Sequence, residues 1–325
     1  VGVAATTCSL SDVLATDLLV IWGANPANNQ PVFMKYLYKA RMNGTRVVVV
    51  NPFLEPGLEH YWVPSTAESM LFGTKMCDLH VPVRPGGDVA FADAALKRLI
   101  ERDAVDQSFI DQHTEHWENV VDHLDSLSYD ELLADAGLTM AQLDAFVAEY
   151  AAAGSAILLW SMGITQHMHA GAGVRGIVNL ALARGNVGRD GTGLMPLRGH
   201  SGVQGGAEMG AYATALPGGL EPNDANASAL AQKWGFDVPA RAGLTAAEIP
   251  EAALAGDIDL LWMSGGNFLE ALPDPRAVER SMERVPLRVH QDIVLSSQML
   301  IPGDDVILLP VRTRYEQEGG GTETT

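Results

Sequence analysis

TDLLVIWGAN, residues 16–25, is the stretch that decides the fold. Its apolar run over 17–22 has the length of a buried strand, and Gly23 with the residues after it ends that run abruptly. A helical pattern follows over 30–42, and a second buried strand, RVVVVN, over 46–51. Strand, glycine turn, helix and strand form a βαβ unit. The sequence therefore predicts a parallel α/β sheet that binds ligands at the carboxyl ends of its strands.

A second stretch, IDLLWMSGGN at 258–267, has Asp, Leu, Leu, Gly and Asn at the same offsets. Each copy is followed by a helix and a second strand. This internal repeat is either a chance match between hydrophobic strands or the sign of two copies of one nucleotide-binding unit. The fold class that we predict is α/β, with two Rossmann-like parallel-sheet domains related by an internal pseudo-repeat. The first domain is expected over residues 1–200 and a second, partial one over 201–325.

The rest of the chain continues the α/β pattern. Residues 89–154 have the spacing of amphipathic helices, and Thr139 with Gln142 matches a capping box. A further helix is expected over 174–184. Other short apolar runs predict strands at 79–83, 156–161, 287–290 and 305–311.

Between the two copies lies RGNVGRDGTGLMPLRGHSGVQGGAEMG, residues 184–210, in which nine of 27 residues are glycine. Backbone of this kind takes positive φ or lets another molecule approach closely. Arg198 stands in this stretch without an acidic neighbour in sequence. Amide donors with one fixed guanidinium suit an anionic ligand. The alternative is a long structural loop in which Arg198 pairs with a distant carboxylate.

Composition limits the function classes. A formal charge of −19 and the absence of a Lys/Arg run argue against a nucleic-acid partner. Cys8 and Cys77 have no CxxC spacing, so they encode neither a disulfide framework nor a thiolate metal site. No apolar run reaches the roughly 18 residues of a membrane span. The chain begins at Val1 without a methionine, and we expect an internal piece of a longer, cytoplasmic polypeptide.

Three short motifs invite other interpretations. GAGVRG at 171–176 satisfies GxGxxG, but nine residues separate it from the preceding strand, which disfavours NAD binding. GHSG at 199–202 lacks the second glycine of a nucleophile elbow. His167 and His169 have no third metal ligand nearby in sequence.

The longer motifs of the chain resemble those of one family. On them the chain resembles the middle portion of a molybdopterin-dependent oxidoreductase of the dimethyl-sulfoxide-reductase superfamily, on the formate-dehydrogenase-like branch. The resemblance covers nearly all of the chain. It implies two-electron oxidation or reduction of a small, anionic substrate and electron transfer with a redox partner. The motifs are WGANPA at 22–27, SMGITQH at 161–167, NLALARGNVGRDGTGLMPLRG at 179–199, VQGGAEMG at 203–210 and EQEGGGTETT at 316–325.

The resemblance also implies the cofactor. In that family two molybdopterin guanine dinucleotides hold one molybdenum or tungsten ion, and two Rossmann-like domains each bind one guanosine end. Because the chain is acidic, we expect backbone N–H groups to bind the pyrophosphates. One dinucleotide would be bound by Gly23, Asn25, Asn51 and Pro52, with Gly86, Gly87 and Asp88 on the same side. The other would be bound by Gly265, Gly266, Asn267, Gln291 and Asp292. Met162, Gly163, Gln166, Gln204 and Gly205 would lie against the pterins.

Arg198 and His200 are the candidate catalytic residues on this resemblance. Arg198 matches the arginine that faces the metal in formate dehydrogenases, where it orients an anionic substrate; its alternative role is a pterin or phosphate anchor. His200 departs from the family pattern, which has glutamine there followed by two asparagines. The segment NPFLEPG at 51–57 is also unusual for the family. Together the two differences indicate that the chain belongs to a divergent subgroup and not to the formate dehydrogenases themselves.

The metal ligand is a cysteine or selenocysteine in that family, and we expect it upstream of Val1, so that no metal ligand lies in this chain. Any [4Fe-4S] cluster would also lie outside this segment. Two alternatives stay open on the sequence. One is a non-catalytic subunit of an electron-transfer complex that keeps the fold, and the other is an NAD-dependent oxidoreductase that uses the glycines of 171–176.

Overall fold

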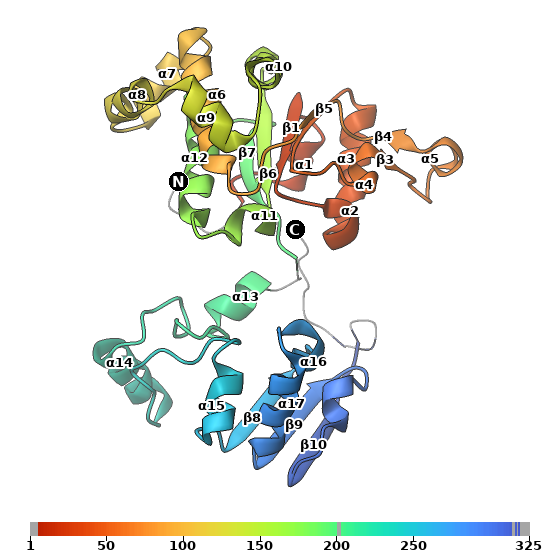
Figure 1. Cartoon of the computed structure of the whole chain (residues 1–325), viewed down its shortest axis with the longest axis vertical. Coiled ribbons are helices and arrows are strands. Elements are labelled where there is room, and N and C mark those ends of the chain that lie inside the picture. Colours follow the sequence, from red (N-terminus) through yellow and green to blue (C-terminus); the bar gives the residue numbers. More distant parts are fainter. Residues whose placement is uncertain (1–5, 200–202, 314–315, 317, 319–325) are drawn as a thin grey trace. The chain divides into compact units, whose positions relative to one another are not determined.

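A computed structural model describes residues 6–199, 203–313, 316 and 318 of the chain. The chain forms two compact units, one of Val1–Ser201 and one of Gly202–Glu323. Each unit has its own parallel sheet with helices packed on it (Figure 1). The α/β class expected from the sequence is confirmed.

The first unit is built on five parallel strands in the order β5-β2-β1-β6-β7. The central strand is β1, and all five of its residues are buried. The strand order reverses between β1 and β6, which makes their carboxyl ends the switch point where open α/β sheets bind ligands. The strands are β1 (Leu18–Trp22), β2 (Arg46–Val50), β5 (Leu79–Val81), β6 (Ala156–Trp160) and β7 (Gly193–Pro196).

Helices cover both faces of this sheet. Trp22 of β1 packs on Phe91, with ring centroids 5.1 Å apart, and Phe91 packs on Phe146 at 4.9 Å. The capping box of Thr139 and Gln142 is confirmed. One face carries α6 (Asp88–Glu101), α10 (Met140–Ala152) and α12 (Ala170–Ala183), and the other carries α3 (Pro31–Met42). The shorter helices are α1 (Leu10–Val13), α2 (Pro26–Asn29), α7 (Gln107–His113), α8 (Trp117–Asp125), α9 (Tyr129–Ala136) and α11 (Met162–Thr165).

Strand β7 lies within the glycine-rich stretch 184–210, where the sequence analysis predicted no strand. Gly193 to Pro196 pair in parallel with β6. A Cβ atom at Gly193 would lie 2.4 Å from Sγ of Cys8, so this glycine lets the strand pack closely against the start of the chain. The glycine content of the stretch therefore has a packing cause at this position.

The GxGxxG motif also has a packing cause. Its glycines lie inside α12, after the helix has begun at Ala170. A Cβ atom at Gly176 would lie 2.7 Å from Cβ of Ala92, so Gly176 allows α12 to approach α6. The motif forms no glycine turn at the end of a strand, as a dinucleotide fingerprint would.

A long connection between β2 and β5 contains secondary structure that the sequence analysis did not predict. It contains a short antiparallel pair, β3 (His60–Tyr61) and β4 (Thr74–Lys75). Two helices accompany the pair, α4 (Pro56–Glu59) and α5 (Ala67–Phe72). Figure 1 shows α5 projecting from the side of the first unit.

The second unit has three parallel strands, which lie where their apolar runs predicted strands; their order in the sheet is β10-β9-β8. Its small core is formed by Met263, Val278, Met282 and Ile301. The strands are β8 (Leu260–Ser264), β9 (Leu287–Asp292) and β10 (Asp305–Pro310). The helices are α13 (Val203–Glu208), α14 (Asp224–Trp234), α15 (Ile249–Ala255), α16 (Phe268–Ala271), α17 (Pro275–Arg284) and the 3₁₀ helix η1 (Ser297–Leu300).

A glycine pair in the first unit yields a stability prediction. Gly23 has φ +58°, and a Cβ atom there would lie 2.9 Å from backbone atoms of Gly163 and Ile164. Gly188 also has positive φ, +78°, but a Cβ atom there would meet no described atom within 4 Å. Gly188→Ala should lower the free energy of unfolding by about 1–2 kcal/mol through backbone strain alone. Gly23→Ala should cost roughly 1–3 kcal/mol more, because backbone atoms must move.

Chemical denaturation of the full chain, followed by near-ultraviolet circular dichroism, measures both variants. Equal losses for Gly23→Ala and Gly188→Ala would show that the turn after β1 has room for a side chain.

Candidate cofactor site

The carboxyl ends of the first unit's five strands carry the residues predicted to bind one dinucleotide, three of those predicted to contact the pterins, and the candidate catalytic residue Arg198. Because the strands are parallel, these ends lie at one edge of the sheet. Gly23 and Asn25 follow β1, and Asn51 and Pro52 follow β2. Gly86, Gly87 and Asp88 come after β5, Met162, Gly163 and Gln166 come after β6, and Arg198 comes after β7.

Two of these turns touch directly at the switch point. The backbone N–H of Gly163 donates to the carbonyl oxygen of Gly23 at 2.9 Å. A Cβ atom at Gly163 would lie 2.5 Å from that oxygen. Glycine is therefore required on both sides of this contact, which joins the turn after β1 to the turn after β6.

Asn25 and Asn51 each present an unsatisfied amide oxygen at this edge. Asn51 is 3% exposed, and its Nδ2 donates to the carbonyl oxygen of Ala24 at 3.0 Å. Oδ1 of Asn25 and Oδ1 of Asn51 are both buried, and neither accepts a hydrogen bond from any residue that the structure describes. A buried acceptor without a partner costs about 1–3 kcal/mol, so each oxygen indicates a missing donor.

Asp88 stands at the start of α6, on the same edge. Its Oδ1 accepts a hydrogen bond from Nε1 of Trp22 at 2.7 Å. Burial raises the pKa of the Asp88 carboxyl, against the opposing effects of the Trp22 hydrogen bond and of the charge of His167. A carboxyl kept where burial disfavours its charge is common at ligand sites.

The second unit also has a glycine turn after β8, although its second residue, Gly266, has positive φ and the corresponding Ala24 does not. Gly265 and Gly266 have φ +71° and +74°, and the N–H of Gly265 donates to the carbonyl oxygen of Gln291 at 2.8 Å. After β1 in the first unit, the N–H of Gly23 donates in the same way to the carbonyl oxygen of Val50 at 3.1 Å. Both turns therefore bond to the strand that follows them in sequence, although the pseudo-repeat itself stays a prediction.

Asn267 follows these glycines in the second unit. Its Nδ2 donates to Oγ of Ser297 at 2.9 Å, while its Oδ1 is buried and has no partner within the described part of the chain. The predicted residues Gln291 and Asp292 end β9. Oε1 of Gln291 accepts from Nε1 of Trp262 at 3.1 Å, and Oδ1 of Asp292 accepts from the N–H of Ile293 at 2.7 Å.

Gln298 supports this turn and was missed from the sequence. It is 1% exposed; its Oε1 accepts from the N–H of Phe268 at 2.8 Å, and its Nε2 donates to the carbonyl oxygen of Gly266 at 2.7 Å. Gln298 lies about thirty positions further along the chain, in η1, where no local pattern marks it. Glu55, which bonds to Asn51, was likewise seen only as part of the unusual NPFLEPG segment.

Four predicted residues lie at or beyond the end of β7. His200 lies outside the described residues. Gln204 and Gly205 fall within α13, but nothing is described beyond their backbone. Arg198 is half-buried, directly after Leu197, whose N–H donates to the carbonyl oxygen of Trp160 at 2.8 Å. The position of Arg198 is thus tied to the end of β6.

The two cysteines are poor metal ligands. Burial raises the pKa of the Cys8 thiol to about 12, and it also raises the pKa of the Cys77 thiol. Burial therefore disfavours the thiolate form of both residues, which is the form that binds metals. No group of three or more His, Cys, Asp or Glu residues in the described ranges is placed to hold a metal ion.

Comparison with known proteins identifies the family. A family model described as molybdopterin oxidoreductase matches residues 1–324. The chain belongs to the molybdopterin oxidoreductase family. It spans 41–45% of the length of the curated relatives that it matches. No helix among the described residues is long and apolar enough to cross a membrane.

Among the relatives of this molybdopterin oxidoreductase chain is protein YdeP of Escherichia coli (strain K12). The two are 31% identical over an alignment of 340 residues, gaps included, that covers 100% of this chain and 44% of that protein. Formate dehydrogenase H of the same strain is 28% identical over 321 residues, 98% of this chain and 42% of that protein. In fold the chain is similar to acetylene hydratase from Pelobacter acetylenicus, with a TM-score of 0.57 and 14% identity over 88% of this chain and 39% of that one.

Membership of the family implies molybdenum or tungsten bound through molybdopterin. The described residues fit such a group in two respects. A Cβ atom at Gly86, Gly265 or Gly266 would meet no described atom within 4 Å, which leaves space for a ligand beside the backbone. The unsatisfied oxygens of Asn25 and Asn267 supply acceptors in the corresponding turns of both units.

Asp88 yields a prediction about pH. Because its folded pKa is raised, the stability that it contributes is present when it is protonated and is lost as pH rises through the folded pKa. Asp88→Asn keeps an oxygen for Trp22 and removes the buried charge, so it should raise the thermal unfolding midpoint at pH 7. The gain should shrink toward pH 4, near the unfolded pKa of roughly 3.9, where wild type is also neutral.

Thermal unfolding of the full chain at several pH values measures this effect, with the exposed Asp122→Asn as a control. A gain that is the same at every pH would show that the Asp88 charge is not the cause.

Proposed function

We propose that this chain is the central part of a molybdenum or tungsten enzyme that binds two molybdopterin guanine dinucleotides and oxidises or reduces a small, anionic substrate by two electrons. The observation that carries the proposal is the paired turn, Gly23 to Asn25 and Gly265 to Asn267. Each turn bonds to the next strand, and each has a buried amide oxygen that lacks a donor within the described residues. The formate dehydrogenases among the relatives support the same class of chemistry.

The chain's own residues have separable roles in this proposal. When bound, the cofactor supplies a metal that exchanges two electrons with the substrate. The turns after β1, β2 and β5 bind one nucleotide, and those after β8 and β9 bind the other. Met162, Gly163 and Gln166 contact the pterins from the end of β6, and Gln204 with Gly205 does so from α13. The metal ligand and any iron–sulfur cluster belong to parts of the protein outside this chain.

Arg198 is the proposed substrate-binding residue, with His200 beside it in sequence. A guanidinium just beyond the end of β7 would orient a carboxylate or oxyanion and stabilise negative charge that develops on it during the reaction. The chain carries a net charge of −19, which disfavours anions at long range. A local cation is therefore needed to hold an anionic substrate.

Substituting Arg198 tests the substrate role. Arg198→Ala should lower turnover at least about tenfold, which corresponds to about 1.4 kcal/mol of barrier, while metal and nucleotide content stay unchanged. The matched control is Arg46→Ala, which removes an exposed arginine from the amino end of β2. Turnover is measured on the full-length enzyme with a panel of small carboxylates and oxyanions, formate among them.

Loss of metal and GMP content in Arg198→Ala, without a specific loss of turnover per metal, would make Arg198 a cofactor anchor. Full-length protein that lacks molybdenum and tungsten, even when produced with cofactor supply, would contradict the enzyme proposal. That result would favour a non-catalytic subunit that keeps the fold.

A further inference from the structure

Asn51 is held rigidly at the end of β2. Its N–H donates to the carbonyl oxygen of Val81 at 3.2 Å, and its own carbonyl oxygen lies 2.8 Å from Nε2 of His80. Since that oxygen can only accept, Nε2 of His80 is the donor. Nδ2 of Asn51 donates to Ala24 at 3.0 Å and to Oε2 of Glu55 at 3.0 Å. Four contacts thus fix the residue, and they leave Oδ1 as its one acceptor without a described partner.

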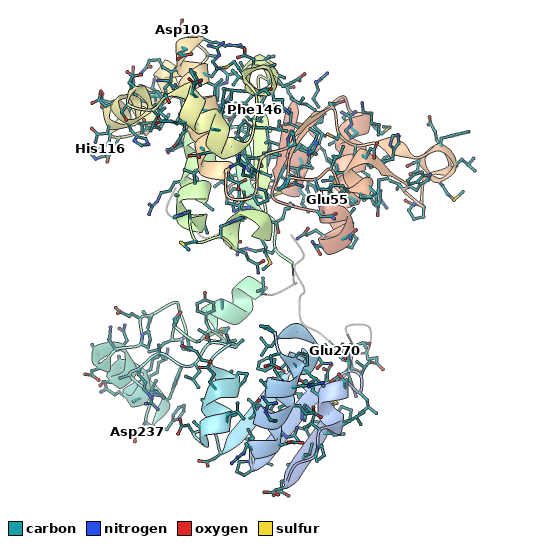
Figure 2. The ribbon with its side chains drawn as sticks, viewed as in Figure 1. Glu55, Asp103, His116, Phe146, Asp237 and Glu270 are labelled. Carbon is teal, nitrogen blue, oxygen red and sulfur yellow. The ribbon has the colours of Figure 1, made fainter. Side chains whose placement is uncertain are left out.

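Two other buried amide oxygens, both in the segment that follows β1, also lack a donor among the described residues. Oδ1 of Asn25 and Oε1 of Gln30 are buried and receive no hydrogen bond from the described part of the chain. Glu55 adds a half-buried carboxylate on the segment that joins β2 to α4 (Figure 2). Its second oxygen is available, since the bond from Asn51 uses Oε2.

This set of acceptors restricts what part of a ligand can lie here. A phosphate has only acceptor oxygens at neutral pH and carries negative charge, so Glu55 repels it. A group that donates two hydrogen bonds satisfies both the Asn51 oxygen and the Glu55 carboxylate. The end of β2 therefore suits the nucleoside part of a nucleotide, and the pyrophosphate must lie elsewhere along the edge.

We propose that Glu55 and Asn51 bind the 2′,3′-diol of the ribose in the nucleotide held by the first unit. The inference rests on the proposed function, because it takes a guanine dinucleotide as the ligand. Two neighbouring hydroxyls supply two donors, one for each acceptor. In Rossmann-like sheets an acidic side chain at the end of the second strand hydrogen-bonds the ribose. Here the neutral Asn51 stands at that end, and Glu55, which is hydrogen-bonded to it, supplies the carboxylate.

Nucleotide binding to the full-length protein, purified from a host that cannot make molybdopterin, tests the inference by isothermal titration calorimetry. Wild type should bind GMP at two sites. Glu55→Gln keeps the side chain's size but has one acceptor oxygen, which cannot serve both Asn51 and a hydroxyl as well as a carboxylate does. Glu55→Gln should raise the dissociation constant of one GMP site at least about tenfold and leave that of the other site unchanged. With 2′,3′-dideoxy-GMP, wild type and Glu55→Gln should bind equally.

Glu59→Gln is the matched control, because it removes an exposed carboxylate from α4, the short helix that follows Glu55, and should bind GMP like wild type. Equal weakening of GMP and 2′,3′-dideoxy-GMP by Glu55→Gln would overturn the ribose assignment. If Glu55→Gln weakens the binding of GMP but not of IMP, which lacks the 2-amino group, Glu55 recognises the base and the ribose assignment is wrong. If Glu55→Gln still binds GMP at two sites with wild-type affinity, this inference is contradicted but the proposed function is not. If wild type does not bind GMP, the proposed function is contradicted as well.

Discussion

The contact between Gly23 and Gly163 is the constraint on which the first unit's site depends. It brings the turn after β1 against the turn after β6 at the point where the strand order reverses. No side chain fits on either residue without moving backbone atoms. The turns at the switch point therefore form a fixed frame of main-chain atoms, and the side chains that vary in chemistry stand on either side of it.

The side chains along this edge of the sheet change from hydrogen-bond acceptors at one end to a cation at the other. Asn51 and Glu55 stand at the end of β2, whereas Arg198 stands at the end of β7. β2 and β7 are three strand spacings apart, which is roughly 14 Å at 4.8 Å per strand. Under the proposed function, this polarity orients a long ligand with its nucleoside toward β2 and the reacting end toward β7.

An acidic chain can bind a charged cofactor without lysines. The formal charge is −19, and the groups at the predicted sites are mostly neutral amides and glycine backbone. Neutral dipoles are held in place by hydrogen bonds such as those that fix Asn51, or that Gln298 makes to the turn of the second unit. Such preorganised dipoles stabilise charge at little cost in rearrangement.

The sequence by itself determined most strands of the two parallel sheets, the glycine turns and the helix over 30–42, because apolar periodicity and turn chemistry are local properties. It also pointed to Asn25 and Asn267 through their place in a repeated pattern. Only the tertiary structure decided that 193–196 is a strand, since this depends on pairing with β6 and contact with Cys8. It alone showed which amide oxygens lack donors, because the partners that satisfy the rest of Asn51 lie up to about thirty residues away in the chain. Hydrogen-bond satisfaction is a property of neighbours in space, which spacing along the sequence does not encode.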